Sequence, residues 1–105
     1  MNKSKDILIA LKKLVAERDS SAKIYLYGSR AKGTAGKDSD WDFLILLNRE
    51  KITSEIEKEI TYPLYDLEFE TGEIISPMVY TQNEWDTKYN ITPFYKNVMK
   101  EGYLI

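Results

Sequence analysis

The sequence predicts an α/β or α+β fold in which helices flank a small mixed sheet of about three strands. The first observation is a set of strand-like apolar runs, which lie at 23–27, 40–47 and 73–80. The second is helical spacing of apolar residues before the first run and between the second and the third. The third is a chain of 105 residues with no internal repeat and no Pro/Gly-rich linker. Residues 1–105 are therefore expected to form a single domain.

Two long helices are predicted around the first two strands. Apolar residues at helical spacing over 4–17 indicate an amphipathic helix that packs on the sheet. A second helix ending near Gly72 is predicted by the apolar residues Ile52, Ile56, Ile60, Leu64 and Leu67, which are three or four positions apart. Because proline costs about 3 kcal/mol inside a regular helix, we expect Pro63 to kink this helix or break it in two.

Shorter helices are predicted after the third strand. Thr81 and Glu84 have the spacing of a capping box, which indicates the start of a short helix containing Trp85. Thr92 and Pro93 suit the N-cap and the first position of a last helix. We expect the helices to cover one side of the sheet.

The most informative stretch is 28–42, GSRAKGTAGKDSDWD. Gly28 and Ser29 fall at the end of the first predicted strand, where glycine allows the backbone to approach a ligand closely. Free N–H groups at such a turn can hold phosphate oxygens. Arg30 could grip a phosphate through two hydrogen bonds, but a solvated or ion-paired Arg30 explains the sequence equally well.

The same stretch ends in two aspartates, Asp40 and Asp42, at the start of the second predicted strand. Alternate residues of a strand share a face, so these two carboxylates lie together and repel unless they are protonated or a cation neutralises them. Magnesium is commonly held by one or two carboxylates together with substrate phosphates. The pattern therefore indicates a nucleoside triphosphate site, although a strand end exposed to water is the simpler alternative. Trp41 and Phe43 point the other way and are predicted to be core residues.

The order Gly28-Ser29-Arg30, Gly33, then Ser39-Asp40-Trp41-Asp42 resembles the minimal nucleotidyltransferases of the DNA polymerase beta-like superfamily. The resemblance implies a polymerase-beta-like nucleotidyltransferase fold, in which the Gly-Ser turn contacts the triphosphate. It also implies that Asp40 and Asp42 are catalytic residues that bind Mg²⁺ for transfer of a nucleoside monophosphate. The resemblance implies ATP or another NTP as donor, and a hydroxyl on a partner protein, a small molecule such as an aminoglycoside, or an RNA end as acceptor. Small members of this family often pair with helical HEPN-type toxins as antitoxins, which makes a partner protein the preferred acceptor.

One position departs from that family. Its members usually carry a third carboxylate on the next core strand, and the corresponding position here is Ser76. A serine cannot act as an anionic metal ligand or as a general base at neutral pH. Glu73 is the first candidate to replace it, and other acids of the preceding helix, Asp66, Glu68 and Glu70, are further candidates. A solvated helix face explains these acids as well.

Composition excludes several classes of function. The chain has no cysteine and no histidine, so thiol nucleophiles, imidazole bases and the usual zinc ligands are absent. Fifteen basic and 17 acidic residues give a net charge of −2, which argues against long nucleic acid as a substrate. No signal-peptide core is visible, and no apolar run approaches about 18 residues. We expect a soluble, cytoplasmic protein without membrane attachment.

The leading hypothesis is a small Mg²⁺-dependent nucleotidyltransferase in which Gly28, Ser29 and Arg30 seat the triphosphate. The alternative is a weakened or inactive domain of the same fold that acts by binding a partner, and Ser76 is its main support. Apolar residues near the end of the chain, Phe94, Val98 and Leu104, could mediate a homo-oligomer or belong to the core.

Overall fold

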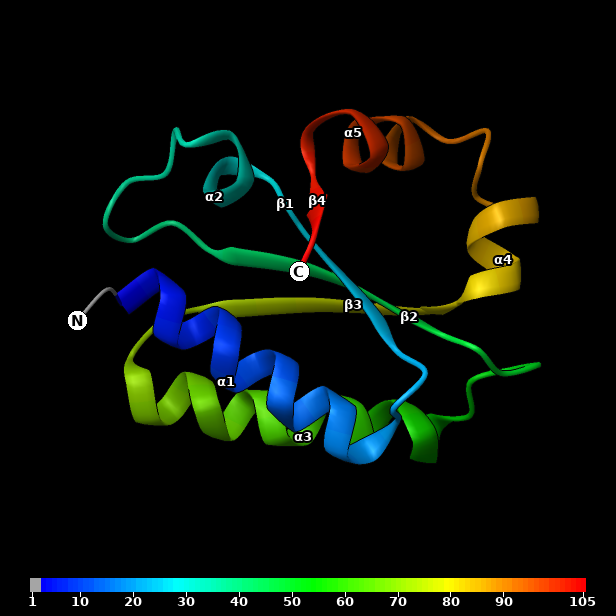
Figure 1. Cartoon of the computed structure of the whole chain (residues 1–105), viewed down its shortest axis with the longest axis horizontal. Coiled ribbons are helices and arrows are strands. Elements are labelled where there is room, and N and C mark those ends of the chain that lie inside the picture. The colour runs from blue at the N-terminus through cyan, green and yellow to red at the C-terminus, as the bar shows by residue number, and fades with distance from the viewer. Residues whose placement is uncertain (1–2) are drawn as a thin grey trace.

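A computed structural model describes the backbone of residues 3–105 and the side chains of residues 6–105. The elements follow one another as α1 (Lys3–Arg18), β1 (Lys23–Tyr27), α2 (Ser29–Lys32), β2 (Trp41–Leu47), α3 (Ser54–Thr71), β3 (Ile75–Thr81), α4 (Gln82–Thr87), α5 (Pro93–Glu101) and β4 (Tyr103–Leu104). Figure 1 shows them as helices arranged around one sheet.

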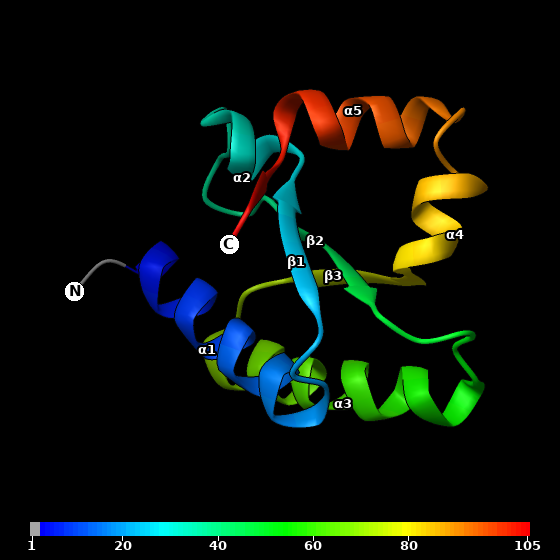
Figure 2. The same cartoon turned by 45° about the vertical axis from the view of Figure 1, so that its right-hand side comes forward.

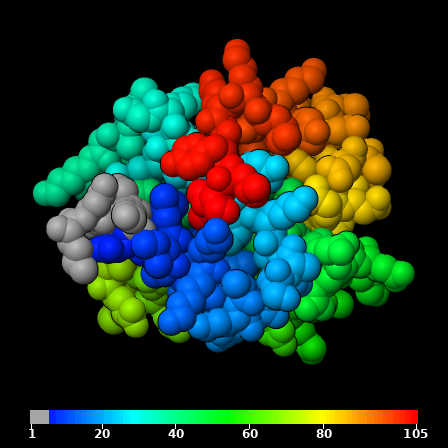
Figure 3. All heavy atoms as spheres, viewed as in Figure 1, coloured from blue at the N-terminus to red at the C-terminus, as the bar shows by residue number. Residues whose placement is uncertain are grey.

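The sheet is mixed, as predicted, with strand order β3-β2-β1-β4. Strand β1 pairs antiparallel with both β2 and β4, whereas β2 and β3 run parallel. The three strands expected from the sequence are present, and β3 begins two residues later than expected. The fourth, β4, has only two residues, and the amide of Ile105 extends its pairing by donating to the Ile24 carbonyl (2.9 Å). In Figure 3 this C-terminal segment lies at the surface between α1 and α5.

Helices cover both faces of the sheet, so the expectation that they cover one side is wrong. Alternate side chains of β2 belong to two cores: Phe43, Ile45 and Leu47 to the first, Leu44 and Leu46 to the second. Helices α1 and α3 close the first core, and α4 and α5 close the second (Figures 1 and 2). The physical reason is that β2 is apolar at consecutive positions, which is typical of a strand buried on both faces.

Helix α3 continues through Pro63 without a break, contrary to one of the two alternatives expected there. Its inner side buries Ile60, Leu64 and Leu67 against the first core. Burial of apolar side chains on both sides of the proline offsets the hydrogen bond that proline cannot donate. Thr53 is the N-cap of the helix, and its side chain accepts from the Ile56 amide (3.2 Å). Gly72, with φ 73°, is the C-cap, so the helix ends near Gly72, as predicted.

The predicted caps of the last two helices are confirmed. Thr81 and Glu84 form the reciprocal capping box of α4, which places Trp85 in the second core. Thr92 caps α5 and Pro93 follows it. On α5, Val98 is buried, so it is a core residue. Among the helices that the structure describes, none combines the length and hydropathy required to cross a bilayer.

Candidate active site

The turn after β1 meets the second aspartate of the pair. Gly28 has φ 74° and ψ −160°, a conformation that is accessible essentially to glycine alone. A β-carbon at this position would collide with Oδ2 of Asp42. The antiparallel pairing of β1 with β2 produces this approach, because it sets Tyr27 opposite Asp42. The predicted phosphate turn and the predicted metal ligand are thus adjacent.

Asp40, Asp42 and Ser76 lie together at one end of the sheet. The parallel pairing of β2 with β3 sets Asp42 beside Ser76, and the Ser76 hydroxyl donates a hydrogen bond to Oδ2 of Asp40 (3.4 Å). Asp42 lies on the same face of β2 as Leu44 and Leu46. Trp41 and Phe43 are buried in the opposite core, so the prediction that they are core residues is confirmed. Ser76 therefore occupies the place expected for a third carboxylate.

The electrostatics of the aspartate pair favour a cation. Burial raises the pKa of Asp42, and the neighbouring Asp40 carboxylate raises it further. Within residues 6–105, neither aspartate forms an ion pair with a basic side chain. Two such carboxylates beside one phosphate-type turn fit a hard divalent cation, which removes their repulsion.

Tyr27 is a site residue that the sequence did not single out. It lies opposite Asp42 in the sheet and packs edge-on against Phe94 of α5, with ring centroids 5.2 Å apart. Burial, and then the charges of Asp42 and Tyr80, raise the pKa of Tyr27 to about 12. The phenol stays protonated at neutral pH and can only donate or accept a hydrogen bond there. In the sequence, the alternation of Tyr27 with Ile24 and Leu26 was the signal from which its position on the sheet could have been found.

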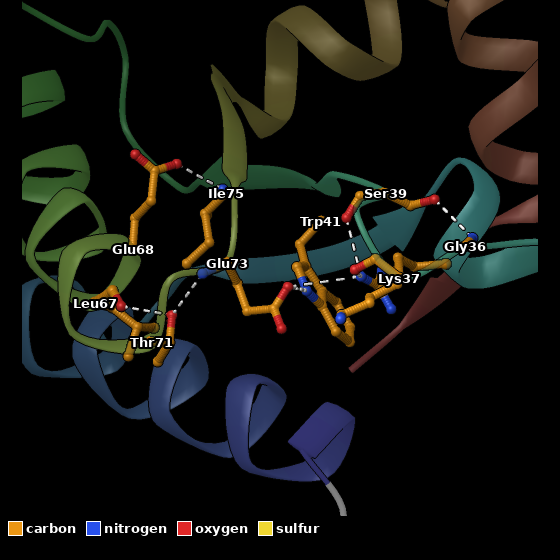
Figure 4. Close-up of polar contacts among 10 residues, drawn as sticks. Gly36, Lys37, Ser39, Trp41, Leu67, Glu68, Thr71, Glu73 and Ile75 are labelled. Atoms are coloured by element: carbon orange, nitrogen blue, oxygen red, sulfur yellow. Dashed lines mark hydrogen bonds and ion pairs between the residues drawn. The ribbon is translucent and has the colours of Figure 1, made fainter.

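Glu73 does not replace the third carboxylate, so the first candidate from the sequence is wrong. Its carboxylate accepts a hydrogen bond from Nε1 of Trp41 (3.4 Å; Figure 4) and pairs with Arg30 (3.6 Å). Trp41 belongs to the first core, on the side of β2 opposite Asp42. Glu68 accepts from the Ile75 amide (2.7 Å). In the described part of the chain, no three acidic, histidine or cysteine side chains are grouped to hold a metal.

Arg30 is engaged with protein atoms. Its Nη2 donates to the Ser39 carbonyl (3.0 Å) and weakly to the Lys37 carbonyl (3.4 Å), and its guanidinium lies 4.4 Å from the centre of the Trp41 ring. The ion pair with Glu73 completes this set, and only 15% of the Arg30 side chain is exposed. Of the two interpretations left open for Arg30, these contacts support the ion-paired one. Through these contacts, Arg30 holds the loop over 33–39 against Trp41, the first residue of β2.

The mixed sheet, whose first turn abuts an aspartate pair, agrees with the fold and the site that the sequence resemblance implies. The family described as nucleotidyltransferase domain matches residues 8–101, and the chain belongs to this family. By family it is therefore a nucleotidyltransferase. No curated protein matches the chain in sequence.

Two solved structures are similar in fold. One is a crystal structure of a toxin–antitoxin with AMP-PNP: 18% identity, TM-score 0.64, covering 95% of this chain and 70% of that one. The other is a crystal structure of a mutant of the MntA-HpeT toxin–antitoxin: 19% identity, TM-score 0.61, covering 100% of this chain and 72% of that one.

Proposed function

We propose that this protein transfers a nucleoside monophosphate from an NTP, with ATP as the preferred donor, to a hydroxyl group on a partner protein, and that it requires Mg²⁺. The observation that carries the proposal is the contact between Gly28 and Asp42. It brings a turn suited to phosphate oxygens against a carboxylate pair suited to a cation, and a triphosphate with its counter-ion needs both together.

Each residue then has a defined task. Gly28 and Ser29 bind phosphate oxygens at the turn, and Asp40 and Asp42 would hold Mg²⁺. When bound, the cation neutralises negative charge on the phosphates and on the leaving pyrophosphate. Tyr27 keeps its proton and offers a hydroxyl donor beside Asp42. Arg30 supports the site indirectly, because it holds the loop that leads into Asp40.

The proposed reaction is a displacement at phosphorus. The acceptor hydroxyl oxygen forms a bond to the α-phosphorus, the bond from that phosphorus to the bridging oxygen breaks, and pyrophosphate leaves. The hydroxyl proton has to be accepted by another group. The Ser76 hydroxyl is not a base at neutral pH, so this proton passes to water or to a group that the acceptor supplies. Transfer is therefore expected to be slow, or to depend on the partner.

The two similar structures support a partner protein as acceptor, because both are toxin–antitoxin structures and one contains an ATP analogue. We propose that this chain is the antitoxin of such a pair in the cytoplasm, and that its partner is a helical HEPN-type toxin. Modification of a hydroxyl on the toxin, such as a tyrosine, would neutralise it.

Titration of the purified protein with ATP, with and without Mg²⁺, tests the proposal when heat release and pyrophosphate are followed in the same samples. We expect binding that requires Mg²⁺ and pyrophosphate that requires an acceptor. Asp40→Ala should abolish the metal-dependent turnover, whereas Glu50→Ala removes an exposed carboxylate beyond the far end of β2 and should leave it unchanged. Undiminished turnover in Asp40→Ala would remove the proposed metal site.

A second candidate function follows from Ser76. A domain that binds nucleotide but lacks the third carboxylate could act on its partner by binding alone. A stable complex with the partner, Mg²⁺-dependent ATP binding and no labelled product would favour this function. Transfer of labelled nucleotide to any acceptor protein would rule it out.

A further inference from the structure

Helix α3 carries a row of large aromatic side chains on the side that faces away from the sheet. Tyr62, Tyr65 and Phe69 are three and four positions apart, so they lie along one line of the helix. They are 56%, 47% and 92% exposed. The Tyr62 and Tyr65 rings are in contact, with centroids 6.2 Å apart. We call these three residues the aromatic row.

The aromatic row is not required to hold α3 on the domain. The opposite side of the helix already buries Ile60, Leu64 and Leu67 in the first core, which is sufficient to anchor an amphipathic helix. A grouped set of exposed aromatic side chains marks an interaction surface more often than isolated exposed residues do. Tyrosine and phenylalanine also provide large contact area with little loss of side-chain entropy.

Charge around the aromatic row restricts what can bind. The exposed charged residues of α3 are five acids and one base: Glu55, Glu57, Glu59, Asp66 and Glu70 against Lys58. None of these acids forms an ion pair with another residue that the structure describes. Two copies of this surface would repel each other, and so would an anionic membrane or a nucleic acid. The surface is complementary to a positively charged protein.

A hollow lies directly beside the aromatic row. Its volume is about 590 Å³, and Tyr62, Pro63, Glu55, Glu59 and Asp66 are among the residues that line it. An aromatic ring next to several carboxylates is the environment in which an arginine side chain binds well, because the guanidinium stacks on the ring and pairs with the acids. Arg18 and Lys58 also border the hollow. An arginine of a partner therefore has to enter between these two basic residues and the acids.

We infer that the aromatic row and its acidic rim form the docking surface for a partner protein that presents arginines beside apolar side chains on a helix. The inference rests on the proposed function in one respect, that a protein partner exists. Helix α3 lies on the opposite side of the sheet from α4 and α5 (Figure 2). Asp42 lies on the face of β2 that α4 and α5 cover, so a partner docked on α3 leaves the proposed nucleotide site free.

The test uses the full chain and two synthetic helical peptides. Both peptides carry leucines at positions i, i+3 and i+7; the first has arginines beside the leucines and the second has glutamates there. Fluorescence anisotropy should show that the arginine peptide binds, that salt weakens its binding, and that the glutamate peptide does not bind. The double variant Tyr62→Ser/Phe69→Ser should weaken binding of the arginine peptide by about tenfold or more.

Ile91→Ser is the matched control, because Ile91 is 80% exposed and lies outside α3, and it should leave peptide binding unchanged. Equal binding of the arginine peptide to the double variant and to the wild type would overturn the inference. So would sedimentation showing a dimer of the wild type that Phe69→Ser dissociates, because the occupant would then be a second copy. ATP binding with Mg²⁺, measured on the same samples, separates the outcomes. Its absence in the wild type contradicts the proposed function, whereas a wild type that binds ATP but not the arginine peptide contradicts the docking surface alone.

Discussion

Gly28 lies against the carboxylate of Asp42 with no room for a side chain between them. The two residues are 14 positions apart in the sequence (42 minus 28), and the antiparallel pairing of β1 with β2 brings them together. The Gly28 turn, which is proposed to bind phosphate, and the acidic pair therefore cannot shift independently. Their relative position is a property of the sheet.

Gly28→Ala should destabilise the fold and remove ATP binding. The new methyl group meets Oδ2 of Asp42, and the backbone conformation adds about 1–3 kcal/mol of strain. Gly33→Ala is the control. Gly33 also has positive φ, 77°, but a β-carbon there meets nothing within 4 Å. Urea unfolding and calorimetric ATP titration of both variants would check this. Equal ATP affinity in the two variants would show that the approach to Asp42 does not matter for binding.

Ser76→Asp should increase the rate of transfer to an acceptor. It returns a carboxylate to the position beside Asp40, where it can accept the hydroxyl proton, and a general base typically contributes about 10²–10⁴ in rate. Ser76→Asn matches the size of aspartate without its charge and should give no increase. The measurement is the initial rate of labelled nucleotide transfer at saturating ATP. A rate unchanged by Ser76→Asp would mean that proton removal is not limiting.

Asp40→Asn should stabilise the fold at neutral pH. Burial and then the Asp40 charge hold the folded-state pKa of Asp42 above its ordinary 3.8. Between pH 3.8 and the raised pKa, the folded chain therefore retains a proton that the unfolded chain has lost. The free energy of unfolding falls as pH rises through this range. The neutral amide of the variant would remove the Asp40 contribution. The gain should be below about 1 kcal/mol, because the pair is partly exposed to water.

The pH dependence provides the check on this stabilisation. The difference between Asp40→Asn and wild type should be present at pH 7 and should disappear below pH 3.8, where Asp42 is protonated in both states. Asp38→Asn removes an exposed acid from the preceding loop and should show no such dependence. A wild type that is more stable than Asp40→Asn at pH 7 would mean that the Ser76 hydrogen bond outweighs the repulsion.

Arg30→Lys should loosen the loop over 33–39. Lysine keeps the positive charge but cannot reach the Ser39 carbonyl, the Trp41 ring and Glu73 at once, and loss of a charged hydrogen bond costs about 1.5–3 kcal/mol. Hydrogen exchange at the loop amides should become faster. The exposed pair of Lys32 and Glu101 offers the control, since Lys32→Ala should cost less than about 1 kcal/mol. Weaker ATP binding with unchanged exchange would instead identify Arg30 as a phosphate ligand.

Local patterns predicted most of the elements and placed the site residues on them. The caps at Thr53, Thr81 and Thr92 depend on neighbours within three residues, so spacing alone was sufficient to find the last two. The position of Ser76 could be counted along the chain because β3 is a regular strand in register with β2.

Long-range contacts explain what the sequence did not show. The second core needs Trp85 and Val98 to reach Leu44 and Leu46 across the chain, and no local pattern reports that contact. The consecutive apolar residues of β2 were the available signal for it. Glu73 was the first candidate for the third carboxylate because it is close to Ser76 in the sequence. The direction of its side chain depends instead on Arg30, which lies 43 positions earlier (73 minus 30).

The alternation along β2 makes the two halves of the 28–47 stretch differ in their tolerance of length change. One extra residue within Trp41–Leu47 would exchange the two cores and turn Asp42 toward α1 and α3. The loop over 33–39 carries no such constraint, because the structure ties it to the domain chiefly through two carbonyls bound to Arg30. A change of length in the loop over 33–39 should therefore be tolerated better than a change of length within Trp41–Leu47.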